Sequence, residues 1–217
     1  MEIRQLLADY SPFNEQEEKD RELMLRYLDQ FDDLFKRENQ LAHFTASSWV
    51  VNRDRTKVLM VYHNIYQSWA WMGGHMDGET DFLATAIRET KEETGIEQVT
   101  PISQELFSLE ILSVDGHVKN GKQVGTHVHL NLTYLLEANE TQQTSVKPDE
   151  NSGVAWMGLE EALTKCSEPY MRIIYAKLND KLNRIRQPLS ADGSHFPSPT
   201  KSGIMAVESI DFAEELL

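Results

Sequence analysis

The chain has 217 residues, of which 40% are hydrophobic, so it suits one folded domain with a small appendage and leaves little room for two. It carries 21 basic and 35 acidic residues, which gives a formal net charge of -14. A negative field of this size opposes nonspecific contact with nucleic acid or with an anionic membrane, and we expect neither as a partner. An anionic small molecule would need a metal ion or a local group of basic residues in order to bind.

Cysteine usage and the N-terminal sequence indicate a reducing compartment. Cys166 is the only cysteine, so no disulfide can form within the chain. The N-terminus lacks the pattern of a signal peptide, and no stretch approaches 18 consecutive apolar residues. We therefore expect a soluble, cytoplasmic protein.

The first predicted element is a long amphipathic helix over residues 14–36, with Asn14 as its N-cap. Its apolar residues recur at helical spacing: Met24, Tyr27, Leu28, Phe31, Leu34 and Phe35. We expect this helix to pack on the body of the domain, and a dimerisation surface is the alternative. Residues 1–40 are then an N-terminal helical extension.

The segments that follow change to the composition of strands. Residues 43–52 and 56–65 are rich in β-branched and aromatic residues and flank a turn, so they predict a hairpin. A short strand at 68–72 runs into two glycines. After a helix, strands are expected within 97–117 and 126–139, with a turn at Asn120-Gly121, and then a short strand at 154–158.

The C-terminal part of the chain contains two predicted helices, at residues 158–166 and 168–185. Strands before and after helices in this order favour an α+β class, a mixed α/β sandwich, over a doubly wound fold. Residues 41–186 are taken as this domain. From residue 187 to 217 the sequence is rich in Pro, Ser and Gly, which predicts a flexible tail.

The helix between the two groups of strands carries an unusual concentration of acid. At about 100° per residue, its core-facing side is predicted to hold Leu83, Ala86, Ile87, Thr90 and Thr94. Glu89, Glu92 and Glu93 then share an arc on another side, where carboxylates at i,i+3 and i,i+4 spacing repel each other. Either this arc is solvated, or a hard divalent cation converts the repulsion into a binding site.

The residues around these glutamates resemble the Nudix box of the MutT-like hydrolases. That pattern places a Gly, a Glu six positions on, and then Arg-Glu, two further Glu and a Gly at fixed spacing. The matching residues are Gly74, Arg88, Glu89, Glu92, Glu93, Gly95 and Ile96. The first Glu of the pattern falls on Thr80, with Glu79 able to replace it, the aliphatic position falls on Thr90, and Met72 replaces a common proline.

The resemblance implies a Nudix fold with an added N-terminal helix, and metal-dependent hydrolysis of a diphosphate linkage in a nucleoside diphosphate joined to another group. By that likeness, Mg²⁺ or Mn²⁺ is held by Glu89, Glu92, Glu93 and the Gly73 carbonyl, with Glu150 as an additional ligand. Arg88 orients the cluster, and Glu89 or an acidic residue of a later loop, Asp149 or Glu150, is the general base. Catalytic roles are thus expected for Arg88, Glu89 and Glu92.

Other expectations carry less chemical detail. Many relatives in this superfamily are dimers, so a homodimer is expected as one possibility. A nucleotide-binding regulatory module without catalysis is the alternative function. Isomerase chemistry, known in another branch of the fold, is disfavoured because Cys166 lies on a late helix.

Four further residues are candidates for substrate contact. His127 and His129 alternate on one strand, so both point to the same face, either toward a phosphate or base or as ordinary strand histidines. His75 directly follows the two glycines and either contacts substrate or stabilises the loop. Trp69, which shares a strand face with Trp71, either stacks on a nucleobase or belongs to the core.

Overall fold

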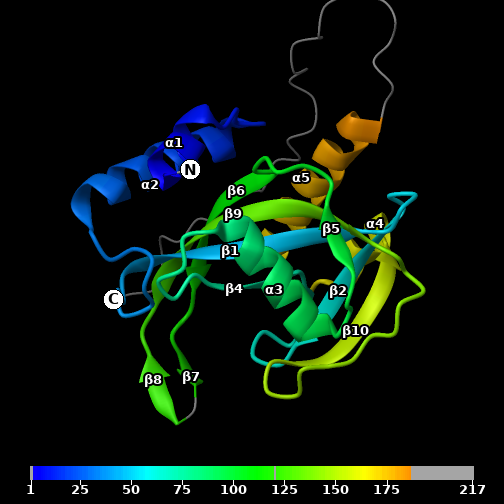
Figure 1. Ribbon diagram of the computed structural model, residues 1–217. Coiled ribbons are helices and arrows are strands. Elements are labelled where there is room, and N and C mark those ends of the chain that lie inside the picture. The colour runs from blue at the N-terminus through cyan, green and yellow to red at the C-terminus, as the bar shows by residue number, and fades with distance from the viewer. Residues whose placement is uncertain (1, 120, 187–217) are drawn as a thin grey trace, which may run out of the picture.

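The computed structural model describes residues 2–119 and 121–186, so the flexible tail predicted for 187–217 lies outside the described residues. Two helices precede the sheet, α1 (Ile3–Asp9) and α2 (Glu15–Gln30). The first of these was not predicted. As expected, Asn14 caps α2, because its side-chain oxygen accepts the backbone N–H of Glu17 at 3.0 Å. Figure 1 shows both helices on one side of the molecule, beside the sheet.

The predicted end of the second helix was wrong. Instead of continuing to residue 36, α2 ends at Gln30, and Phe31 is extended with φ -132° and ψ 131°. The chain turns there so that Leu34 is buried and Phe35 packs on the rings of Phe44 and Phe82. These apolar residues keep helical spacing in the sequence, but they reach the core from a loop.

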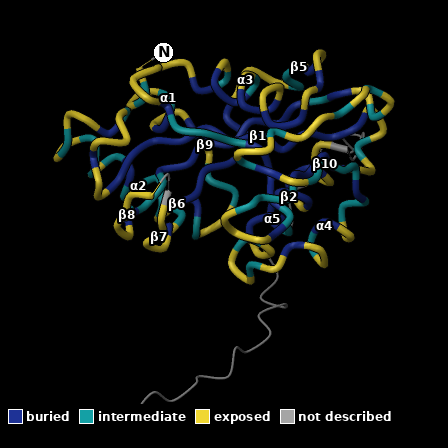
Figure 2. The backbone as a smooth tube through the Cα atoms, turned by 90° about the horizontal axis from the view of Figure 1, so that it is seen from below, coloured by how far each residue is buried: buried dark blue, intermediate teal, exposed yellow. Residues whose placement is uncertain are grey.

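The centre of the fold is an eight-stranded mixed sheet. Five of its strands follow the order β10-β2-β1-β9-β5, and the other three pair beside them. The predicted hairpin is formed by β1 (Ala42–Val51) and β2 (Lys57–His63). Strand β9 (His127–Ala138) runs parallel to β1, and β6 (Ser108–Val114) pairs with the same β9. In Figure 2, β1 and β9 run as dark blue, buried segments through the middle of the molecule.

The remaining strands differ from the predicted ones in their bounds. The strand expected at 68–72 is split into β3 (Ser68–Ala70), which pairs with β2, and β4 (Met72–His75), which pairs with β1. Two short strands, β7 (His117–Lys119) and β8 (Lys122–Val124), flank the predicted turn, where Gly121 has φ 74°. Strands β5 (Val99–Pro101) and β10 (Asn151–Gly158) lie at the two ends of the sheet order.

Helices cover both faces of the sheet, so the architecture is the expected α+β sandwich. Alternate residues of β1 point to opposite faces: Val50 belongs to a core shared with α3 (Phe82–Thr94) and the N-terminal helices, and Trp49 belongs to a second core. That second core is closed by α4 (Leu159–Lys165) and α5 (Pro169–Arg186), where Trp49 stacks on Tyr175 at a centroid distance of 5.2 Å.

The N-terminal helices pack on the body of the domain, as the sequence predicts. Leu7 and Met24 are fully buried in the core that contains α3. Glu17 of α2 is also buried, and it forms ion pairs with two lysines of α5, Lys181 at 2.8 Å and Lys177 at 3.1 Å. Among the described residues, no helix is long and apolar enough to cross a membrane.

Candidate functional site

The acidic helix α3 is fixed at both ends by its own sequence. Asp81 is the N-cap, with its carboxylate accepting the backbone N–H of Ala84 at 3.0 Å. Gly95 follows the helix in the left-handed region at φ 73°, and its N–H bonds to the carbonyl of Lys91. A Cβ on Gly95 would lie 2.1 Å from the Ser145 hydroxyl, so the loop packs closely where the helix ends.

The buried side of α3 is wider than the predicted one, whose five residues are all buried or packed on the core. Leu83 and Ile87 are only half-buried, whereas Phe82, Thr85, Ala86, Thr90 and Thr94 are buried together with two glutamates. Glu89 retains 8% and Glu93 only 3% of its accessible surface, and Glu92 is the exposed member of the three. Glu89 and Glu93 therefore do not lie on a solvent-exposed side of the helix, which was one of the two alternatives for these glutamates.

The two glycines of β4 leave room for these carboxylates. The backbone N–H of Gly73 donates to Oε1 of Glu93 at 2.9 Å. A Cβ on Gly74 would lie 2.3 Å from the Glu89 carboxyl group, so only glycine permits this approach of helix and strand. Gly74 and Glu89, which both match the sequence motif, are thus in direct contact.

Burial raises the pKa of both carboxyl groups. The pKa of Glu93 rises to about 8, because desolvation disfavours the charged form and the Gly73 hydrogen bond offsets this only in part. The pKa of Glu89 is raised as well, mainly by desolvation and despite the neighbouring Arg88. A bound cation would stabilise the ionised form of both carboxyl groups.

Cationic side chains and a further carboxylate surround the mouth of this cluster. Arg88 contacts Oε1 of Glu89 at 2.9 Å and Oε1 of Glu92 at 3.2 Å. Lys147 lies 3.6 Å from Glu92 and 3.1 Å from Glu150, so Glu150 belongs to the same group, while Asp149 is exposed on the same turn. Lys147 was not predicted, because it is one of several charged residues in a loop without periodicity.

Side chains at the three departures from the motif have roles of their own. Thr90, at the aliphatic position, bonds to the Ser48 hydroxyl at 2.6 Å and to the Ala86 carbonyl at 2.8 Å, which ties α3 to β1. Glu79 is exposed, whereas Asp81 serves as the helix cap. Met72 is fully buried in the core shared with α3.

The predicted histidines lie together, next to one that was not predicted. His127 and His129 point to one face, as their alternation indicates, with their Nε2 atoms 3.2 Å apart. Their rings and that of His75 surround His43 of β1 at centroid distances of 4.9 to 5.0 Å. The pKa of His129 is lowered to about 2 and that of His43 is lowered too, because burial disfavours the imidazolium. The rings of His43 and His129 are therefore neutral at neutral pH.

The two tryptophans have different surroundings. Trp71 is buried and packs edge-on against Tyr175, so it belongs to the core. Trp69 is half-buried and contacts Tyr62 edge-on, at a centroid distance of 5.6 Å. A Cβ on Gly153 would lie 3.2 Å from the Trp69 ring, so this indole covers β10 and is not part of the histidine group.

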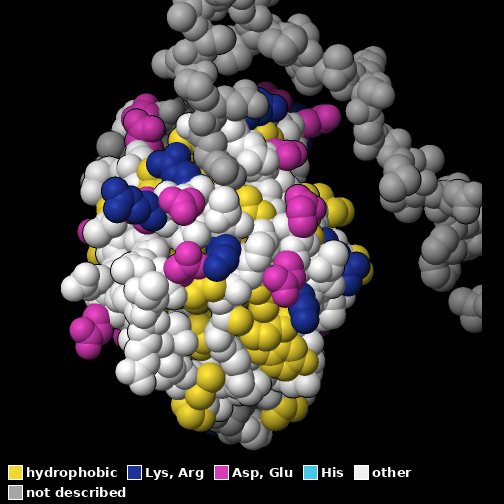
Figure 3. All heavy atoms as spheres, turned by 90° about the vertical axis from the view of Figure 1, so that its right-hand side faces the viewer, with side chains coloured by type: hydrophobic (Ala, Val, Ile, Leu, Met, Phe, Trp, Pro, Cys, Tyr) yellow, Lys and Arg dark blue, Asp and Glu magenta, His cyan; other side chains and the backbone are white. Residues whose placement is uncertain are grey.

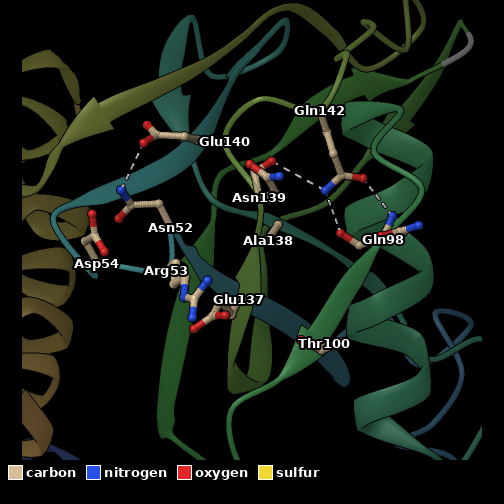
Figure 4. Close-up of a pocket in the computed structure, with 10 residues that line it drawn as sticks. All are labelled: Asn52, Arg53, Asp54, Gln98, Thr100, Glu137, Ala138, Asn139, Glu140 and Gln142. Atoms are coloured by element: carbon tan, nitrogen blue, oxygen red, sulfur yellow. Dashed lines mark hydrogen bonds between the residues drawn. The ribbon is translucent and has the colours of Figure 1, made fainter.

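A shallow pocket of about 390 Å³ lies at the opposite end of β9 from the histidines (Figure 4). Its polar lining is tied together by hydrogen bonds, such as Asn52 to Glu140 at 3.4 Å and Gln142 to the Gln98 carbonyl at 2.7 Å. It contains none of the motif residues.

Figure 3 shows acidic and basic side chains interspersed on the face near β10 and α4, with apolar side chains gathered in one part of it.

The glutamate cluster suits a hard divalent cation. Carboxylate oxygens are the preferred ligands of Mg²⁺ and Mn²⁺. Here Arg88 contacts Glu89 and Glu92, Lys147 contacts Glu92 and Glu150, and the charges of Glu89 and Glu150 act on Glu93. In a site without a metal, these two cations balance part of the negative charge. The residues present therefore fit the ion.

Comparison with known proteins places the chain in a family. Residues 42–178 match the family model described as the NUDIX domain. An Ap4A hydrolase from C. elegans, solved as a binary complex, is 21% identical over 65% of this chain and 96% of its own, with a TM-score of 0.45. A NUDIX family hydrolase from Clostridium perfringens is 22% identical over 64% and 97%, with a TM-score of 0.44.

A third solved structure, the dihydroneopterin triphosphate pyrophosphohydrolase of E. coli, is 15% identical over 62% of this chain and 92% of its own, with a TM-score of 0.47. The search of curated proteins found no match. The family model covers well over half of the sequence and includes the whole glutamate cluster. The chain therefore belongs to the Nudix, or MutT-like, hydrolase family.

Proposed function

We propose that the protein is a divalent-metal-dependent hydrolase that cleaves the diphosphate linkage of a nucleoside diphosphate joined to another moiety. The observation that carries this proposal is the pair of buried carboxyl groups, Glu89 and Glu93, held one turn apart on α3 against the glycines of β4. Such a pair destabilises the metal-free fold, so its presence beside the exposed carboxylate of Glu92 favours a role in chemistry.

The proposed ligands are the carboxylates of Glu89, Glu92, Glu93 and Glu150 together with the Gly73 carbonyl. Mg²⁺ or Mn²⁺ bound there would neutralise charge on the diphosphate and lower the pKa of an attacking water. Lys147 contacts both Glu92 and Glu150, so it would move toward solvent or toward a substrate phosphate when these carboxylates turn to the ion.

The chain's own groups supply orientation and proton transfer. We assign Glu89 as the general base or as a ligand in the same cluster, because its raised pKa brings it nearer to neutral pH than an ordinary glutamate. Arg88 is assigned to hold Glu89 and Glu92 in place, since it contacts both. Glu92, the exposed member, is the carboxylate best placed to meet an incoming phosphate group through a cation.

Substrate contacts are proposed for His75, His127 and His129 on one side of β4, and for Trp69 at a greater distance. The histidines would hydrogen-bond to phosphate oxygens or to a base edge. Trp69 is separate from the histidine group, so it would contact the far end of an extended substrate, by stacking.

The test is turnover on a panel of diphosphate compounds, measured as release of phosphate or nucleotide with and without Mg²⁺ or Mn²⁺. We compare the wild type with Glu92→Gln and Glu93→Gln. A lost ligand removes several kcal/mol of charge stabilisation, and about 1.4 kcal/mol is a tenfold change, so each variant should lose roughly 10²-fold or more in kcat/KM.

Glu97→Gln is the matched control, because Glu97 is exposed just beyond the same helix. It should keep wild-type activity. Normal metal-dependent turnover by Glu93→Gln would overturn the site assignment. Tight nucleotide binding without turnover across the whole panel would favour the regulatory module instead.

A further inference from the structure

Four imidazole rings are assembled on one face of the sheet by strand pairing. His43 of β1 lies directly beside His129 of the parallel strand β9, and His75 of β4 pairs with Thr45 of β1, two residues further along. His127 stacks on His43 at a centroid distance of 4.9 Å, with 29° between the ring planes. The glutamate cluster takes no part in holding these rings together.

Hydrogen bonds fix which nitrogen carries the lone pair in three of the four rings, those of His43, His127 and His129. Nδ1 of His43 lies 2.9 Å from the Asn39 carbonyl and Nδ1 of His127 lies 2.9 Å from the Gly125 carbonyl. A carbonyl only accepts, so both Nδ1 atoms carry hydrogen and both Nε2 atoms carry a lone pair. His127 Nε2 then accepts from Nε2–H of His129, which leaves the lone pair of His129 on Nδ1.

Within the part of the chain that the structure describes, Nε2 of the buried His43 has no hydrogen-bond partner. His43 retains only 3% of its accessible surface, and its Nε2 lies among the buried side-chain atoms without one. A buried acceptor left unpaired costs about 1 to 3 kcal/mol. Asn39 holds the ring in the orientation that creates this cost, which is the arrangement seen when a carbonyl orients a metal-bound histidine.

The distances between the rings suit a transition-metal ion. One ring nitrogen from each of His43, His75 and His129 lies within 4.8 Å of the others. Four-coordinate Zn²⁺ with Zn–N bonds of about 2.0 to 2.1 Å separates its nitrogens by roughly 3.3 Å. Side-chain rotations that bring each nitrogen closer by about 1 Å would complete the site, and the half-buried His75 and His129 leave it open to solvent.

The histidines and the glutamates are separate groups with different preferences. A Cβ on Gly74 would point at Glu89, so His75, the next residue of β4, points to the opposite face. Imidazole nitrogens favour borderline ions such as Zn²⁺, Co²⁺, Ni²⁺ and Cu²⁺, whereas the carboxylates favour Mg²⁺ and Mn²⁺. The two groups should therefore select different ions.

We propose that His43, His75 and His129 form a second metal site, specific for a divalent transition-metal ion of the Zn²⁺ class, with His127 orienting His129. Three protein nitrogens leave a fourth position on the ion for water or for an oxygen of a bound molecule. The site does not depend on the hydrolase activity proposed above, and it is an alternative to the direct substrate contacts proposed there for His75, His127 and His129.

The test uses full-length protein without an affinity tag, stripped with chelator and titrated with Co²⁺. We expect visible d–d absorption bands of low-symmetry Co²⁺ that saturate at one equivalent and disappear on addition of one equivalent of Zn²⁺. An excess of Mg²⁺ should leave the bands unchanged. Absence of the bands, or their loss with Mg²⁺, would overturn the proposal.

Variants assign the site to its residues. His43→Gln and His129→Gln should each lose the bands and the rise in melting temperature caused by Zn²⁺, with far-UV circular dichroism confirming that they fold. His63→Gln, which changes a histidine of β2 outside the group, and Glu92→Gln, which weakens the glutamate cluster, should both retain them. Bands that persist in both His43→Gln and His129→Gln, or that vanish in Glu92→Gln, would contradict the assignment.

Discussion

Glu93 links the chemistry of the site to the stability of the fold. Its folded-state pKa of about 8 exceeds the ordinary glutamate value of 4.5, so between these values the folded protein holds a proton that the unfolded chain has released. In chelator, the free energy of unfolding should therefore fall as pH rises through this window, by up to about 1.4 kcal/mol per pH unit. Glu89 acts in the same direction. Urea unfolding at several pH values measures the slope.

Added Mg²⁺ or Mn²⁺ should reverse this trend, because the ion binds the ionised carboxylates and must displace the proton from Glu93. The stabilisation by metal is then largest near pH 8 and small in mild acid. In Glu93→Gln, both the loss of stability in chelator and the pH-dependent gain with metal should be reduced. An unchanged pH profile in this variant would show that Glu93 ionises normally.

Residue-level prediction of which side chains meet succeeded around one helix, while the catalytic and metal-binding roles of these residues stay predictions. The contacts of Gly74 with Glu89 and of Arg88 with Glu92 join motif residues singled out from the sequence. It failed where contacts depend on strand register or loop conformation. His43 meets His129 only because β1 and β9 pair in one particular parallel register, and Lys147 reaches Glu92 from an irregular loop.

At the scale of elements, α2 is joined to the sheet and to α5 through a buried charge network. The carboxylate of Glu17 accepts hydrogen bonds from Lys181, from the Tyr10 hydroxyl at 2.6 Å and from the Phe13 backbone N–H at 2.7 Å. Burial alone would raise the pKa of Glu17, but Lys177 and Lys181 together lower it. Lys177 also contacts the buried Glu110 of β6 at 2.9 Å, so three elements meet in one network.

Glu17→Gln should destabilise the protein strongly. The substitution leaves two buried lysines with Glu110 as their remaining acidic partner in the network, and breaking a buried ion pair on one side costs about 3 to 5 kcal/mol. Glu18→Gln, at the exposed neighbouring position of the same helix, should change stability by less than about 0.5 kcal/mol. Chemical unfolding of both variants at neutral pH tests this, and equal stability of the two would show that the network contributes nothing.

Element-level prediction succeeded where the sequence carries start and stop signals. Asn14 was predicted as the N-cap of α2 and Gly95 as the left-handed residue that ends α3, and both are found in the structure. The other end of α2 was wrong because Leu34 and Phe35 keep helical spacing while reaching the core from a turn. The buried side of α3 was predicted too narrowly, because helical spacing placed Glu89 and Glu93 on an arc away from the core, and the close approach of β4 buries them there.

At the scale of the whole molecule, the N-terminal helices complete a core that the matched region does not close by itself. The family model begins at residue 42, but Leu7 and Met24 are fully buried and Leu34 nearly so, in the core that also contains α3. Helix α2 also supplies Glu17 to the ion-pair network with α5. The homodimer expected from the sequence stays a prediction, and light scattering in solution would test it.

A chain that begins at Leu41 should therefore lose its cooperative fold. Removing one large buried side chain costs about 2 to 5 kcal/mol, whereas a whole domain is stable by only about 5 to 15 kcal/mol. The truncation removes three such side chains and also leaves Lys177 and Lys181 without Glu17. Thermal unfolding followed by circular dichroism should show no sharp transition. Met24→Ala in the full chain should unfold cooperatively at a lower temperature than the wild type, and a truncated chain that melts like the wild type would mean that the sheet and its C-terminal helices fold independently.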